Sequence, residues 1–206
     1  MYIAVDMKTR TYDMRARQQA KDATRDAIIN AAIDAFQAER TFSITLPAVA
    51  ERANVTVKTV LRHFGNRESL IDVAWQRLFD DIRAEREPPP DDPATALDVL
   101  IEHYERRGTM VLTTLASEDH DPRAKRMNSA GRSGHRAWVE QVFGARLPEH
   151  PVERSRVVDV LVVATDVYTW KLLRHDRGLS VGDVADRMLM MTEALVAAPL
   201  RRDTRG

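Results

Sequence analysis

The chain has 206 residues, of which 44% are apolar, and it carries 31 Lys and Arg against 31 Asp and Glu. This apolar fraction supports a packed core and excludes a disordered chain. Because it has no Cys, disulfides and thiolate metal sites are excluded as well. No apolar run approaches the roughly 18–20 residues of a membrane span, and the polar start lacks a signal-peptide core, so we expect a cytoplasmic protein.

The balanced charge hides an uneven distribution. Residues 1–67 carry 11 Lys and Arg against 7 Asp and Glu, whereas residues 68–206 carry 20 against 24. A basic N-terminal third suits a head that binds a polyanion, attached to a body with another task. An imbalance of this size can also arise by chance.

The first stretch of the chain, residues 1–23, is polar and charged. We interpret it as a flexible basic arm that either reaches DNA phosphates and the minor groove or remains a solvated tail. Its basic residues are Lys8, Arg10, Arg15, Arg17 and Lys21.

A compact helical head is predicted over residues 24–70. In its first helix Ile28, Ala32 and Phe36 recur every four residues, which places them on one buried stripe. Three further helices should each begin at a side chain that can accept a hydrogen bond from the first turn. These capping residues are Thr45, Thr56 and Asn66, and Gly65 suits the end of the third helix.

Beyond the head we expect a helical body, residues 71–206. The stretch EPPPDDP (87–93) interrupts the helical pattern, as a hinge between domains or as a loop between packed helices. No run shows the alternation of a strand, so the fold class is all-α with about nine helices. The predicted helices after the break are 94–106, 109–117, 122–144, 152–175 and 181–197.

The last two predicted helices indicate a homodimer. Their apolar residues either repeat with heptad-like spacing or surround most of the helix, and such surfaces must be covered. A second copy of the same helix pair can cover them in a two-fold four-helix interface, and packing within the chain is the alternative. The predicted interface residues are Val160, Val163, Val167, Val184, Met188, Met191 and Leu195.

Two short helices joined by a tight turn, the second with a polar outer face, form a helix-turn-helix arrangement. The major groove of DNA admits one helix, whose outward side chains meet base edges. Val60 and Phe64 can anchor the third helix to the core of the head. This leaves Thr56, Lys58, Thr59, Arg62 and His63 for the groove, although each could also be only a cap or a solvated residue.

The stretch TRDAIINAAIDAF…FSITLPAVAERANVTVKTVLRHFGNRESLIDVAW resembles the DNA-binding head of the TetR family of bacterial transcription regulators. The resemblance implies a homodimer that binds a (pseudo)palindromic DNA operator as a repressor and is released by a small-molecule ligand. It implies that the third helix recognises DNA through Val57, Lys58, Thr59, Leu61, Arg62 and His63, with Thr45 and Arg67 on phosphates.

Two positions depart from the family pattern. Leu61 stands where the family usually has Tyr, so the usual phosphate hydrogen bond cannot form. Leu61 can touch a thymine methyl group or pack inward, and we favour packing. Lys58 replaces a small residue and adds a charge that faces the groove.

The resemblance implies a ligand pocket in the body. Large residues there are candidates to line it, although most are expected in the core: Tyr104, Met110, Trp138, Tyr168 and Trp170. The alternative is a DNA-binding protein without a ligand, whose body serves only dimerisation or protein contacts. No catalytic motif occurs and the six His lack metal-ligand spacing, so we expect no enzyme, no metal site and no cofactor.

Overall fold

The computed structural model describes residues 7–39, 44–87 and 92–197. The chain divides into two compact units, residues 1–81 and 82–206, and the division falls within helix α4. The described ranges contain helices and connecting segments but no strand, as the all-α prediction requires. No helix in these ranges has the length and apolar character needed to cross a membrane.

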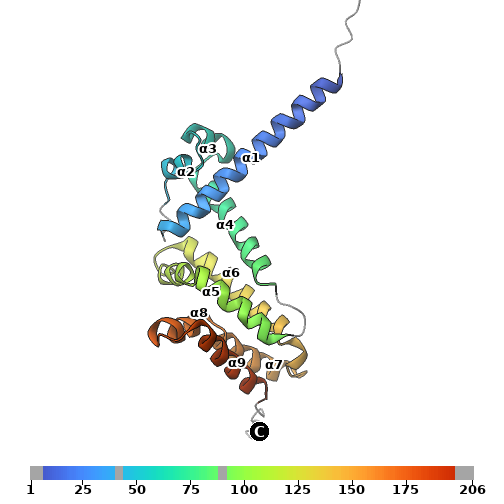
Figure 1. The fold of residues 1–206 in the computed structure, drawn as a ribbon, viewed down its shortest axis with the longest axis vertical. Coiled ribbons are helices and arrows are strands. Elements are labelled where there is room, and N and C mark those ends of the chain that lie inside the picture. Colours follow the sequence, from blue (N-terminus) through green and yellow to red (C-terminus); the bar gives the residue numbers. More distant parts are fainter. Residues whose placement is uncertain (1–6, 40–43, 88–91, 198–206) are drawn as a thin grey trace, which may run out of the picture. The chain divides into compact units, whose positions relative to one another are not determined.

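The first unit consists of three helices and most of a fourth (Figure 1). They are α1 (Met7–Glu39), α2 (Leu46–Arg52), α3 (Val57–Phe64) and α4 (Arg67–Glu85). Helix α2 packs against both α1 and α3, so it is held between them. The buried core of the unit includes Ile28, Ile29, Phe36, Val49, Val60 and Leu70.

Helix α1 is longer than the sequence pattern indicated. It begins at Met7, so residues 7–23 of the predicted flexible arm are helical, while residues 1–6 lie outside the described ranges. The side chains of residues 14–23 are exposed, so burial does not hold this part of the extension in place. Residues 7–23 contain neither Gly nor Pro, and the helix therefore propagates from its buried half.

The three predicted caps of the head are confirmed. Each accepts a hydrogen bond from a backbone N–H three residues later, which satisfies a donor that the first turn leaves free. The bonds run from Ala48 to Thr45 Oγ1 (3.3 Å), from Thr59 to Thr56 Oγ1 (3.1 Å) and from Ser69 to Asn66 Oδ1 (2.8 Å). Gly65 ends α3 with a φ of 79°, a conformation that favours glycine.

The second unit, the body, contains the end of α4 and the helices that follow it. They are α5 (Pro93–Ala116), α6 (Pro122–Val142), α7 (Pro151–Ala164), α8 (Val167–Lys171) and α9 (Val181–Ala197). A short turn η1 (Gly144–Arg146) follows α6, and a π-helical turn η2 (Leu172–Asp176) follows α8. Helix α5 packs against α6, α8 and α9, and α7 packs against α6 and α9.

Helix α5 is continuous where we predicted two helices separated near Gly108. That glycine is needed for packing, because its backbone meets the ring of Trp170 from α8. A Cβ atom placed on Gly108 would lie 2.4 Å from Cζ3 of Trp170, well inside van der Waals contact. The residue therefore admits a buried indole without breaking the helix.

The predicted helix 152–175 is instead divided into α7 and α8. The Thr165 hydroxyl donates to the Leu161 carbonyl at 2.8 Å, and Asp166 caps the new helix by accepting from Tyr168 N–H at 2.8 Å. Periodicity missed this break because Val163 and Val167 continue the apolar pattern across it. The local hydrogen bonds of Thr165 and Asp166 decide it.

Two histidines are buried in the body, His103 on α5 and His135 on α6. His135 Nε2 lies 3.0 Å from Thr165 Oγ1, whose own proton goes to the Leu161 carbonyl. The imidazole therefore donates from Nε2, and its Nδ1 accepts from Arg86 Nη2 at 2.9 Å. Burial, and then the charge of Arg86, lower the pKa of each histidine to about 3.

We expect Gly108→Ala to lower the free energy of unfolding by about 1–3 kcal/mol, because overpacking against Trp170 outweighs the gain of about 1 kcal/mol in helix propensity. Gly131→Ala in α6 is the matched control, since nothing lies within 4 Å of its added Cβ. The control should be neutral or stabilising. Equal effects of both variants in urea unfolding would contradict the packing role.

We also expect stability to fall as the pH drops below about 6.5. Unfolded histidines bind protons near pH 6.5, whereas His103 and His135 stay neutral in the fold down to about pH 3. Unfolding then takes up protons, and each histidine removes up to about 1.4 kcal/mol of stability per pH unit. His103→Phe should roughly halve the histidine part of the loss between about pH 7 and pH 5 in urea titrations. An unchanged loss in this variant would contradict the assignment.

Candidate nucleic-acid interface

Helix α3 has one buried face and one exposed face. Val60 is 0% exposed and Phe64 9%, four residues further along, so both point into the head. On the opposite side the side chains of Lys58 and Arg62 are exposed, again four residues apart. The anchoring predicted for Val60 and Phe64 is confirmed, and it turns two cations outward.

The turn between α2 and α3 is fixed by backbone hydrogen bonds. Asn54 adopts a φ of 51°, in the left-handed region that Asn tolerates better than most residues. Its N–H donates to the Glu51 carbonyl at 3.0 Å, and Val55 N–H donates to the Ala50 carbonyl at 2.9 Å. The chain thus reverses within a few residues and starts α3 at the cap residue Thr56.

The threonines predicted to contact DNA also serve inside the head. Thr45 and Thr56 are exposed, but each cap accepts a backbone hydrogen bond. The hydroxyls of Thr56 and Thr59 lie 3.0 Å apart and share one further hydrogen bond. Val57 and Thr59 are half-buried. A DNA contact by the Thr45 or Thr56 hydroxyl would therefore come in addition to its hydrogen bond to the first turn of α2 or α3.

Arg67, predicted on a phosphate, ties two segments of the head together. Its Nε donates to the Ile44 carbonyl at 2.7 Å, and its Nη1 lies 3.2 Å from Glu68 Oε1. The side chain is about one-third exposed. A phosphate contact would have to share the guanidinium with these partners, so Arg67 has a structural role that sequence reasoning missed.

Leu61 points outward, contrary to our expectation that it packs inward. It is 39% exposed, whereas Val60 beside it is completely buried. The reason is that α3 is short and buries only Val60 and Phe64 against the core, so the neighbouring side of the helix is not covered. An apolar side chain therefore stands on the outer side of the helix, next to Arg62.

Two cations of α1 lie beside α3. The Arg25 guanidinium sits 5.2 Å from the centre of the Phe64 ring. Burial lowers the pKa of His63, and the charges of Arg62, Lys21 and Arg25 lower it further. His63 is therefore neutral at pH 7 within a positive neighbourhood. Sequence reasoning assigned Lys21 to an arm and missed Arg25, although their spacing of four residues would have revealed a shared helix face.

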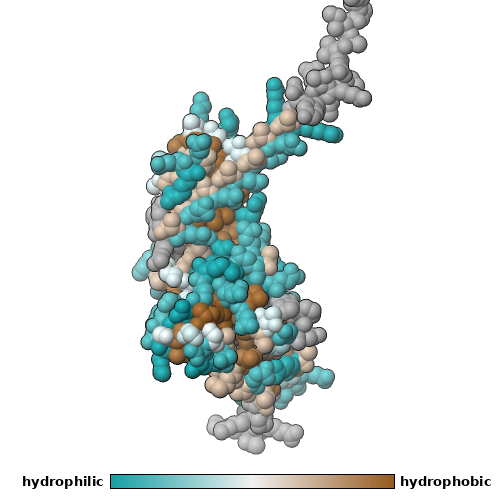
Figure 2. Space-filling model, viewed as in Figure 1, coloured by the Kyte–Doolittle hydropathy of each residue, from teal (hydrophilic) through white to brown (hydrophobic). Residues whose placement is uncertain are grey.

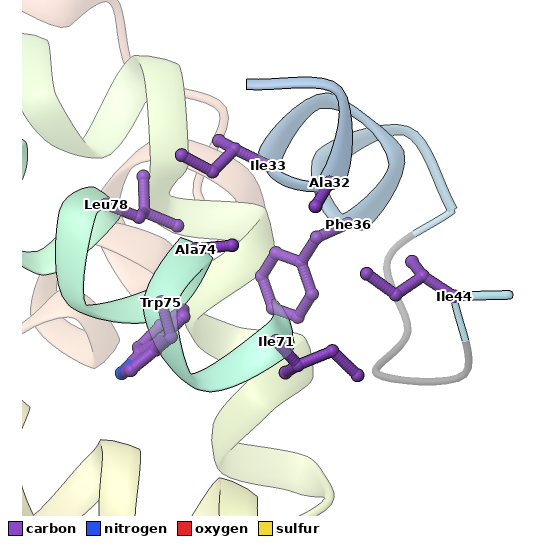
Figure 3. A pocket seen from close by; sticks show the side chains of 8 residues that line it. All are labelled: Ala32, Ile33, Phe36, Ile44, Ile71, Ala74, Trp75 and Leu78. Carbon is purple, nitrogen blue, oxygen red and sulfur yellow. The ribbon is translucent and has the colours of Figure 1, made fainter. Parts of the chain in front are cut away.

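The same unit also contains an apolar cleft, lined by side chains of α1 and α4 and by Ile44 (Figure 3). Its empty volume is about 280 Å³, open solvent included. The Phe36 ring meets the Trp75 ring edge to face, with centroids 5.7 Å apart. The cleft is lined by Ala32, Ile33, Phe36, Ile44, Ile71, Ala74, Trp75 and Leu78. These side chains join α1 to α4.

Four of the five ligand candidates are buried in the body: Tyr104, Met110, Trp138 and Trp170. Three of these four already use their polar group in a hydrogen bond within the chain. The Tyr104 hydroxyl donates to the Thr165 carbonyl, the Trp138 indole N–H donates to the Arg86 carbonyl, and the Trp170 indole N–H donates to Glu105 Oε1. Tyr168 is 55% exposed. The five therefore do not converge on one surface.

The predicted dimer residues separate into three groups by their exposure. Val167, Val184 and Met188 are at most 4% exposed and belong to the core of the body. These three residues therefore pack within their own chain, which was the alternative to the dimer. Val160 and Val163 on α7 are 42% and 67% exposed. Met191 and Leu195 on α9 are half-buried against the same core.

Within the described ranges, no group of three or more acidic or histidine side chains is arranged to hold a metal ion.

Residues 28–74 match the family model for bacterial regulatory proteins of the tetR family. The fold is similar to that of a protein from Rhodococcus sp. described as a TetR-family transcriptional regulator, with 19% identity and a TM-score of 0.58 over 85% of this chain and 100% of that one. A TetR transcriptional regulator from Streptococcus agalactiae 2603V matches with 22% identity and a TM-score of 0.58 over 87% of this chain and 98% of that one. A search of curated proteins found no match.

The matched segment begins in α1 and ends in α4, so it contains the turn, the caps and the outward face of α3. The two solved structures extend the likeness of fold to the body. The helix-turn-helix head, residues 28–74, is therefore similar to the heads of bacterial regulatory proteins of the tetR family.

Proposed function

We propose that this regulator binds a (pseudo)palindromic operator as a homodimer, acts as a repressor and is released from DNA by a small-molecule ligand. DNA-binding regulation follows from the likeness of the head to this family, which is not a family of enzymes. The operator geometry, the dimer and the ligand are the proposal.

The observation that carries the proposal is the outer face of α3. Lys58 and Arg62 are exposed on one side of a helix that begins at a fixed cap, and Leu61 is exposed to one side of them. A helix with this face fits a major groove, where Lys and Arg can reach guanine or phosphate and an apolar group can touch a thymine methyl. Lys21 and Arg25 of α1 add positive charge next to it, which favours any DNA.

An exposed apolar face of α7 supports the dimer. Val152, Val160 and Val163 are 62%, 42% and 67% exposed, and helical spacing places them within one sector of the helix. Figure 2 shows apolar residues at the surface of the body, in the region of α8, among charged ones. A two-fold pairing through α7 would present two heads to half-sites whose spacing follows the helical repeat of DNA.

A ligand can release the dimer only if it binds the DNA-free form better than the DNA-bound form, and the loss in DNA affinity equals that difference. The alternative, a body that serves only dimerisation or protein contacts, predicts no ligand. Thermal unfolding with candidate metabolites separates the two, because a ligand of the folded protein raises Tm.

We expect Lys58→Ala and Arg62→Ala to weaken binding to an operator obtained by selecting genomic fragments with the purified protein. Loss of a base contact should cost about 1–3 kcal/mol at that base, and loss of a phosphate contact should lower the salt slope by about 1. Fluorescence anisotropy across salt concentrations measures both. The control is Arg77→Ala, whose exposed ion pair with Asp26 (3.2 Å) lies elsewhere in the head. Wild-type binding by both test variants would refute this recognition face.

We expect Val163→Asp to convert a dimer into monomers without unfolding the chain, since this side chain is already 67% exposed. Met14→Asp is the control, because Met14 is 65% exposed on α1 in the other unit. Light scattering after gel filtration gives the mass, and circular dichroism checks the fold. A dimer that persists in Val163→Asp would move the interface away from this face of α7.

A further inference from the structure

The end of α4 places a cation in the body without a counter-ion. The Arg86 guanidinium lies 5.4 Å from the centre of the Trp138 ring, and its Nη2 donates to His135 Nδ1. Trp138 Nε1–H in turn donates to the Arg86 carbonyl at 3.1 Å. Indole and imidazole therefore hold this side chain in one orientation, and both are neutral partners.

The charges around Arg86 leave it unpaired. Among the described residues no carboxylate forms an ion pair with it, and its Nε–H is covered from solvent without a hydrogen bond. The adjacent Glu85 pairs with Arg107 instead. Arg107 Nη2 donates to Glu85 Oε1 at 2.6 Å, and Arg107 Nε donates to Glu85 Oε2 at 3.2 Å. A guanidinium stays protonated in proteins, so burial here lowers its pKa but cannot remove the charge.

His103 adds a second unused polar atom. It is 2% exposed on α5, and its Nδ1 is covered without a hydrogen bond. Glu85 Oε2 lies 3.8 Å from this Nδ1, beyond hydrogen-bonding distance. Glu85 directly precedes Arg86 in the chain, so this distance places His103 near Arg86, and after burial the charge of Arg86 is the next cause that lowers the pKa of His103. Buried polar atoms of this kind ordinarily have a partner.

We propose that Arg86 and His103 bind the carboxylate group of a small organic acid, which is the effector of this regulator. This inference rests on the proposed ligand response and gives that ligand a chemical class. A carboxylate supplies one negative charge for Arg86 and two acceptor oxygens, one for Arg86 Nε–H and one for the Nδ1–H of a neutral His103. Arg is suited to this role, because its planar fork matches the geometry of a carboxylate.

Several features of the surroundings fit such a ligand. Arg86 as a whole is only half-buried, so part of this side chain meets solvent although its Nε–H is covered. Trp138 and Tyr104, next to Arg86 and His103, are buried aromatic side chains against which the organic part of the acid would pack. His135 is neutral and, through Nδ1, accepts from Arg86, so it orients the guanidinium and does not compete for the anion.

The test measures Tm of the full chain with benzoate and hexanoate, each beside its neutral amide, at pH 7.5 and constant ionic strength. Sodium phosphate serves as an inorganic anion. We expect at least one carboxylate to raise Tm, by about 3–6 °C at ten times its Kd, and the amides to have no effect. Arg86→Gln and His103→Phe should each lower the affinity at least tenfold. Arg83→Gln, at an exposed position in the last turn of α4, is the matched control and should bind as wild type.

The proposal is overturned if neither carboxylate raises Tm, if the amides act equally well, if phosphate alone does so, or if both site variants bind as wild type. His103→Phe keeps the test decisive if Arg86→Gln does not fold, since His103 Nδ1 makes no hydrogen bond that the variant would break. DNA affinity is measured separately. A carboxylate that binds through Arg86 but leaves operator affinity unchanged would refute ligand release and leave the binding site standing.

Discussion

The burial of Val60 and Phe64 is the constraint on which the head depends. These two side chains set the rotation of α3 about its own axis, and that rotation decides which residues face outward. The caps at Thr56 and Asn66 and the turn at Asn54 then set where α3 begins and where α4 follows it. A helix of only eight residues has little intrinsic stability, so its geometry comes from these anchors.

The body combines a tightly packed part with a polar part. Trp170 rests on Gly108, which brings α8 close to α5. A chain of hydrogen bonds runs from Arg86 through His135 and Thr165 to the Leu161 carbonyl, and it joins the end of α4 to α6 and α7. Burial and the charge of Arg86 keep His135 neutral, so Arg86 is the charged member of this hydrogen-bonded series. This imbalance distinguishes the cluster from an ordinary buried polar network, in which donors and acceptors match.

Much of the head was predictable because its signals are local. A capping side chain acts on a backbone N–H three residues away, and Val60 and Phe64 show their shared face by their spacing alone. Leu61 was mispredicted, because whether it is covered depends on how much of α3 the rest of the head encloses. Arg25 was missed for a related reason. Its place beside α3 follows from the packing of helices that are separate in the sequence.

In the body, composition and periodicity by themselves determined the all-α class, the break after α4 and the extent of α9, because these depend on backbone preferences within one segment. They did not determine which apolar stripe faces inward: Val184 and Met188 look like a seam for a second copy, yet they fill the core of their own chain. The unpaired charge of Arg86 was likewise decided only by the tertiary structure. Whether a charge is buried, and whether an acid stands opposite it, depends on side chains that are distant in the sequence and meet only in the fold.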